Sequence, residues 1–195
     1  MSKCTKIKRK AKIAMKFIEI FKKVWYYLIA RGKDTNNKRE KRKNREDDVM
    51  NAITLSNYII EKFIEQGASV TNLKLQKVLY YVQGYSLKFF GKPAFQEEIY
   101  SWQYGPVVPM AYYEYNRSGA RQLSPSSSGK AILAPEQMKL INRIVDACKK
   151  IPSSTLVTKT HNEDPWKYSY VGEVISIEKI ISYFSRNNPL EIALW

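Results

Sequence analysis

The residues best suited to chemistry are His161, the only histidine of the chain, and two acidic residues that follow it, Glu163 and Asp164. A carboxylate that orients an imidazole is typical of acid–base sites, and a histidine beside carboxylates can also bind a metal. A zinc site requires three or four ligands, however, and the chain has no second histidine. The sequence therefore favours a structural histidine at a helix C-terminus, which binds carbonyl groups and holds the Pro165-Trp166 corner in place.

The remaining sequence shows no catalytic or cofactor motif. Its glycines have neither the spacing of a phosphate-binding loop nor that of a dinucleotide-binding turn. The two cysteines, Cys4 and Cys148, form neither a disulfide framework nor a metal-binding spacing, which indicates a reducing compartment. We therefore expect a cytoplasmic protein that is not an enzyme and has no cofactor and no metal.

The elements that position these residues centre on a predicted helix over residues 72–90 and the segment that follows it. Apolar residues recur there with helical spacing, whereas Lys74 and Lys77 fall away from them, so we expect both lysines on the exposed side. Residues 95–102 are rich in aromatic and β-branched residues, which predicts a short strand. Gly105-Pro106 is a turn dipeptide and excludes a helix at that point. The apolar stripe consists of Leu75, Val78, Leu79, Val82 and Phe89.

Further helices are expected on both sides of this stretch. One is predicted to be capped at Thr54 to Ser56, and a later one to begin at Pro135. A last helix is predicted after a cap at Ser176. Shorter helices are predicted over residues 107–116 and 153–160. Together these elements predict a mainly α fold (α+β with a small β element) over residues 50–186, followed by a tail over residues 187–195.

The basic charge of the chain belongs to its N-terminal part. Residues 1–49 contain 17 Lys and Arg against 6 Asp and Glu, whereas residues 50–195 contain 16 against 12. Residues 1–30 predict a basic amphipathic helix, and residues 31–49 a charged linker before Met50, which could be an alternative start. This arm could pack on the domain, contact a membrane surface, or bind DNA phosphates through residues 1–48. The residues expected to make arm contacts are Phe17, Phe21, Lys22, Lys23 and Trp25.

Several motifs of residues 52–186 together resemble one known family. They are Leu73-Lys-Leu-Gln-Lys77 with the helix that continues to Tyr85, Trp102-Gln-Tyr-Gly-Pro106, and His161-Asn-Glu-Asp-Pro-Trp166. Their order and spacing closely resemble the SocA-like antitoxin domain, also called Panacea, which includes phage-associated GepA-like proteins. The resemblance implies a mainly helical domain that binds and neutralises a protein toxin encoded nearby, in a toxin–antitoxin system linked to phage defence. It also allows a role as an adaptor to a Clp-type protease.

The resemblance also directs attention to particular residues. We expect toxin contacts from the central helix and from the aromatic Gly-Pro corner, and a structural role for the late motif. The expected toxin-binding residues are Lys74, Gln76, Lys77, Tyr81, Trp102, Gln103, Tyr104, Gly105 and Pro106. The expected structural residues are His161, Glu163, Pro165 and Trp166. A nucleic-acid-binding regulator that uses the basic arm is the alternative, and an enzyme built on His161 ranks third.

Overall fold

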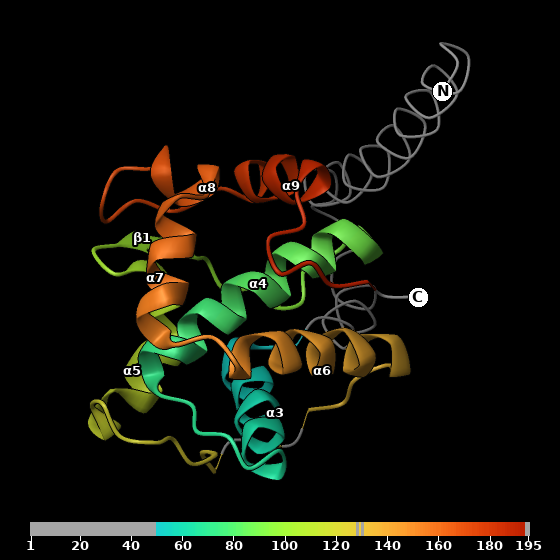
Figure 1. Ribbon diagram of the computed structural model, residues 1–195, viewed down its shortest axis with the longest axis vertical. Coiled ribbons are helices and arrows are strands. Elements are labelled where there is room, and N and C mark those ends of the chain that lie inside the picture. Colours follow the sequence, from blue (N-terminus) through green and yellow to red (C-terminus); the bar gives the residue numbers. More distant parts are fainter. Residues whose placement is uncertain (1–49, 128, 130, 194–195) are drawn as a thin grey trace, which may run out of the picture.

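The computed structural model describes residues 50–127, 129 and 131–193 (Figure 1). The predicted arm helix over residues 1–30, the linker over residues 31–49 and the arm contacts from Phe17 to Trp25 lie outside this range. Within it, the chain is mainly helical with one two-stranded antiparallel sheet, which confirms the predicted fold class. The elements in chain order are α3 (Ala52–Glu65), α4 (Asn72–Phe90), β1 (Tyr100–Trp102), β2 (Gly105–Val107), α5 (Pro109–Tyr115), η1 (Asn116–Ser118), α6 (Pro135–Lys149), α7 (Ser153–His161), α8 (Asp164–Lys167) and α9 (Ile177–Arg186).

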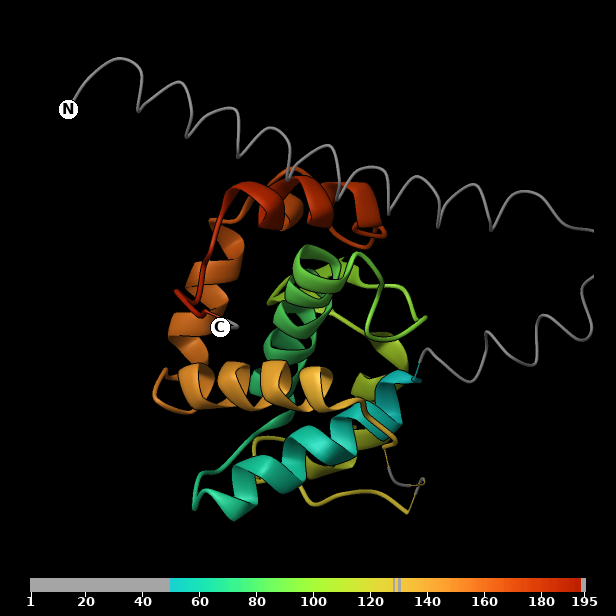
Figure 2. The same ribbon diagram turned by 90° about the vertical axis from the view of Figure 1, so that its right-hand side faces the viewer.

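Helix α4 is the centre of the fold. It lies between α9 and α6 in both views, and α3, α5 and α7 also contact it (Figures 1 and 2). Every α4 side chain from Lys74 to Leu87 is therefore buried, including the polar ones. Gly84 allows a close contact between α4 and α9, because a Cβ at this position would overlap the ring of Phe184 on α9.

Local signals in the sequence fix most helix ends. Thr71 caps α4, which ends at Gly91 in the left-handed conformation, and Ser176 caps α9. Pro135 occupies the first turn of α6 as predicted. The predicted cap of α3 at Thr54 to Ser56 is wrong, because the cap is Asn51, whose side chain accepts a hydrogen bond from the Thr54 backbone at 2.8 Å.

The β element is shorter than predicted. Residues 95–99 do not join β1. Gln83 accepts hydrogen bonds from the amides of Ala94 and Phe95 and donates one to the Phe95 carbonyl, and the Ile99 carbonyl accepts one from the Ile175 amide. β1 and β2 then form a hairpin whose turn is Gln103-Tyr104. The predicted helix over residues 107–116 begins instead at Pro109, because β2 continues through Val107. None of the helices described here is both long and apolar enough to cross a membrane.

Candidate functional site

Polar side chains of α4 hold the hairpin from beneath. The Gln76 carboxamide accepts a hydrogen bond from the Val108 amide at 2.9 Å and donates one to Asn72 at 2.9 Å. Asn72 in turn donates to the carbonyl of Tyr112 on α5 at 2.9 Å. Lys77 donates from Nζ to the Pro106 carbonyl at 3.0 Å. These four hydrogen bonds fix β2 and the start of α5 on the central helix.

The predicted exposure of Lys74 and Lys77 is wrong. Lys77 is 0% exposed and Lys74 is 8% exposed, because helices cover α4 on all sides and leave it no solvent-facing stripe. Burial lowers the pKa of Lys77 to about 7. Gln76 and Tyr81 are also buried. Since a buried side chain cannot contact a partner without rearrangement of the core, these four residues do not form a surface.

Gly105 makes the close approach between the hairpin and the helices possible. Its φ of +100° favours glycine, and a Cβ there would lie 2.8 Å from Lys77 Nζ and 2.9 Å from Thr160 Oγ1. Gly105 and Pro106 are both buried. The Gly-Pro pair therefore faces the interior, and only the turn in front of it reaches solvent.

His161 and Trp166 hold the hairpin from the side of α7 and α8. His161 is the last residue of α7, and its ring stacks on the Trp166 indole with centroids 3.8 Å apart and planes 7° apart. The imidazole also hydrogen-bonds the backbone of Gln103, and the Trp166 Nε1 donates to the Trp102 carbonyl at 3.0 Å. Burial, and then the charge of Lys77, lowers the pKa of His161. Both rings thus fix the backbone where β1 leads into the turn.

The acidic residues after His161 have partners other than its imidazole. Glu163 is 4% exposed and accepts a hydrogen bond from the Tyr81 hydroxyl at 2.9 Å. Burial raises the pKa of Glu163 to about 7, and the nearby hydroxyls of Tyr80 and Tyr81 offset only part of this rise. The Tyr80 hydroxyl is close enough to lower the pKa of Glu163. Neither this hydroxyl nor the Glu163 Oε2 forms a hydrogen bond with another described residue, however.

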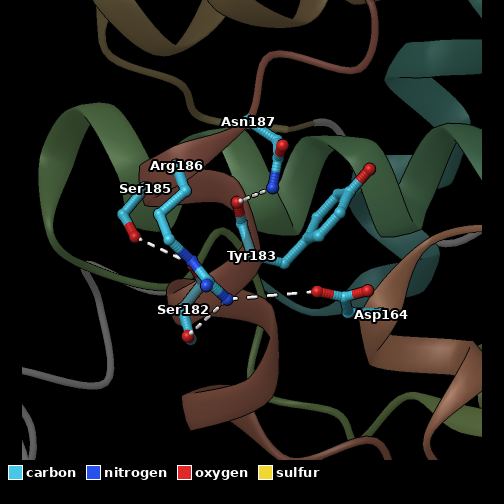
Figure 3. A network of polar contacts seen from close by, with 6 residues as sticks. All are labelled: Asp164, Ser182, Tyr183, Ser185, Arg186 and Asn187. Atoms are coloured by element: carbon cyan, nitrogen blue, oxygen red, sulfur yellow. Dashed lines mark hydrogen bonds and ion pairs between the residues drawn. The ribbon is translucent and has the colours of Figure 1, made fainter.

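Asp164 likewise faces a different partner. Its carboxylate lies 4.0 Å from the Arg186 guanidinium, which also donates to the Ser182 carbonyl of α9 at 2.9 Å (Figure 3). This exposed contact joins α8 to α9. Neither acidic residue therefore orients His161 as an acid–base site would require. No group of three or more potential metal ligands occurs within the part of the chain that the structure describes.

The surface that remains accessible around the hairpin is aromatic. Tyr104 at the turn is 61% exposed, and Trp102 is half-buried behind it. On α5, Tyr113 is 61% exposed and Met110 is 51% exposed. The Trp102 ring meets Tyr112 and Tyr113 edge-on, with centroids 5.0 and 6.1 Å away. We call Trp102, Gln103, Tyr104, Met110, Tyr112 and Tyr113 the hairpin surface.

Sequence reasoning placed only part of this surface. Trp102, Gln103 and Tyr104 were expected in it, whereas Met110, Tyr112 and Tyr113 were not assigned. The available signal was the cluster of tyrosines over residues 112–115, because several tyrosines in a short helix suggest a packed face with a polar edge. Only the pairing of β1 with β2 brings α5 beside Trp102.

Comparisons with known proteins agree with the resemblance seen in the sequence. Residues 75–167 match the family model of the antitoxin SocA-like Panacea domain. The chain is also 26% identical over 129 residues to Antitoxin SocA of Caulobacter vibrioides (strain NA1000 / CB15N), which covers 60% of this chain and 69% of that protein. No solved structure matches the chain.

Proposed function

We propose that this chain, whose residues 75–167 match the family model of the antitoxin SocA-like Panacea domain, neutralises a protein toxin encoded nearby by direct binding in the cytoplasm. The matched segment begins within α4 and includes the hairpin, α5, α6 and α7. Of these helices, α4 and α7 contact β2. The relative in Caulobacter vibrioides is named an antitoxin. An antitoxin of this kind needs a binding surface and no catalytic centre.

The observation that supports the proposal is the contrast between the two parts of the site. The charged and polar residues of α4, together with Gly105 and Pro106, lie beneath the hairpin and fix its backbone. The residues above it present tyrosine, tryptophan and methionine side chains to solvent. Tyrosine and tryptophan are enriched among the residues that dominate protein–protein binding energies, and a rigid support lowers the entropy cost of ordering them.

Co-expression of the chain with the product of the adjacent open reading frame tests this function. The neighbouring product should arrest growth when it is induced alone, and the full chain should restore growth. The two proteins should also elute together in size-exclusion chromatography, because neutralisation is proposed to occur in a complex. A neighbour that is harmless alone, or growth restored without a complex, would contradict the proposal.

Three further roles belong to the same proposal as alternatives or additions. Delivery of the toxin to a Clp-type protease would appear as toxin loss that depends on this protease. The basic charge of residues 1–49 motivates an alternative function, that of a DNA-binding regulator. It also motivates an additional role, contact of these residues with a membrane surface. Phosphate binding through residues 1–48 should be independent of DNA sequence and should weaken steeply with salt. Replacing the lysines of the arm by glutamine should abolish it.

A further inference from the structure

The turn over residues 168–174 exposes an unusual number of apolar side chains. Tyr168, Tyr170 and Val171 are 66%, 81% and 68% exposed, and Val174 is 39% exposed. Single exposed apolar residues are ordinary, but a contiguous group of them marks an interaction site. No motif assigned a role to this turn, which follows α8 and precedes α9.

Backbone pairing makes the turn continuous with the hairpin surface. The Ser101 amide donates to the Glu173 carbonyl at 2.8 Å, and the Gly172 amide donates to the Ser101 carbonyl at 2.6 Å. Tyr100 and Val174 form an antiparallel bridge, so their side chains lie on the same face of the sheet. Trp102 shares this face, because side chains alternate along a strand, and Ser101 between them is buried.

The end of the turn next to β1 is acidic. Glu98 and Glu173 are both exposed. Glu98 accepts a hydrogen bond from the Tyr100 hydroxyl at 3.0 Å, and Glu173 accepts one from the Tyr170 amide at 3.4 Å. Neither carboxylate forms an ion pair with any of the residues that the structure describes. Both carboxylates are therefore available to a positively charged group on a partner.

The basic residues of this region lie at the opposite end of the turn. Lys179 donates to the Tyr168 carbonyl at 2.7 Å and to Ser169 Oγ at 2.9 Å. Lys167 Nζ lies 5.7 Å from the centre of the Tyr168 ring. The turn thus combines an apolar tip, formed by Tyr170 and Val171, with one acidic side and one basic side. On the basic side, Lys179 already donates hydrogen bonds within the turn.

We infer that the turn over residues 168–174 is a second part of the toxin-binding surface, which receives an apolar segment of the partner that carries a Lys or Arg beside it. This inference rests on the proposed function and adds the chemistry of the partner. The apolar tip would supply contact area, and Glu98 with Glu173 would orient the segment and speed its approach.

Calorimetry with the purified full chain and the product of the adjacent open reading frame tests the inference. Tyr170→Ala combined with Val171→Ser should raise the Kd at least about tenfold. Glu173→Lys should raise it at low salt, chiefly through a slower association, and the difference should shrink at high salt. Ile132→Ala, at an apolar residue that is 94% exposed, and Glu61→Lys on α3 are the matched controls and should leave the Kd unchanged.

The outcomes separate this inference from the proposed function. If Tyr104→Ala weakens binding while the turn variants do not, the turn lies outside the interface and the antitoxin function stands. If the turn variants change only the self-association of the chain in sedimentation, a second copy occupies the turn and the inference is wrong. If the wild-type chain does not bind the neighbouring product, the proposed function fails and the inference fails with it. Circular dichroism spectra that match the wild type establish that each variant is folded.

Discussion

Lys77 places its ammonium group 3.0 Å from the carbonyl oxygen of Pro106, at the base of the hairpin, in a fully buried position. Burial alone accounts for the lowering of its pKa to about 7, and no acidic group of the described residues offsets it. Burial of this amine therefore costs free energy of folding at the point where β2 contacts α4. The hairpin is therefore attached to the core by a group whose protonation opposes folding.

Replacement of Lys77 by methionine should remove a specific pH dependence of stability. Because the pKa of Lys77 falls from 10.5 to about 7 on folding, the unfolded chain binds more protons between these values, and stability should rise with pH across this range. Lys77→Met should lose this contribution while costing about 1 kcal/mol for the missing hydrogen bond. Urea unfolding of both proteins from pH 7 to pH 10.5 measures the difference. Parallel curves would contradict a lowered pKa for Lys77.

Glu163 should give a contribution of opposite sign at lower pH. Burial raises its pKa from 4.5 to about 7, so the folded protein keeps a proton that the unfolded chain loses. Its favourable contribution is complete below pH 4.5 and is lost as the pH rises to 7. Glu163→Gln keeps a neutral group beside Tyr81 and should be progressively more stable than the wild type over this range. A difference that does not change with pH would show that Glu163 titrates normally.

Gly105→Ala should loosen the hairpin. The substitution forces a side chain into a positive φ and places its Cβ against Lys77 and Thr160, which should cost about 1–3 kcal/mol. Gly119→Ala is the matched control, because Gly119 also has a positive φ but has no atom within 4 Å of its Cβ position. Thermal unfolding should show the larger loss for Gly105→Ala, with toxin neutralisation reduced only in that variant. Equal losses would mean that the contacts beneath the hairpin contribute nothing.

Gly84→Ala should separate α4 from α9. Its φ is ordinary, so the cost arises from overlap with the Phe184 ring and should amount to about 1–3 kcal/mol. A double-mutant cycle with Phe184→Leu checks this cause, because a smaller side chain at residue 184 should relieve part of the overlap. Additive losses would indicate that the two residues do not compete for the same space.

The sequence predicted the helices and strands better than the packing of other elements around them. Caps and breakers such as Thr71, Pro135 and Ser176 act within a few residues, so the fold class and most helix ends could be read locally. The burial of Lys74 and Lys77 could not be predicted in this way, because a helical period shows which side of a helix is apolar but not whether other helices cover its polar side. Met110 and Tyr113 joined the candidate site only through the pairing of β1 with β2. The turn over residues 168–174 joined β1 through backbone hydrogen bonds, which no side-chain pattern encodes.

The most direct test of the account is toxin neutralisation by a chain that carries Tyr104→Ala and Tyr113→Ala. Both side chains are 61% exposed and neither supports the core, so the double variant should fold with an unchanged melting temperature. In co-expression with the toxic product of the adjacent open reading frame, growth should no longer be restored, although the Ile132→Ala control should restore it fully. Full rescue by the folded double variant would contradict the claim that the hairpin surface binds the toxin.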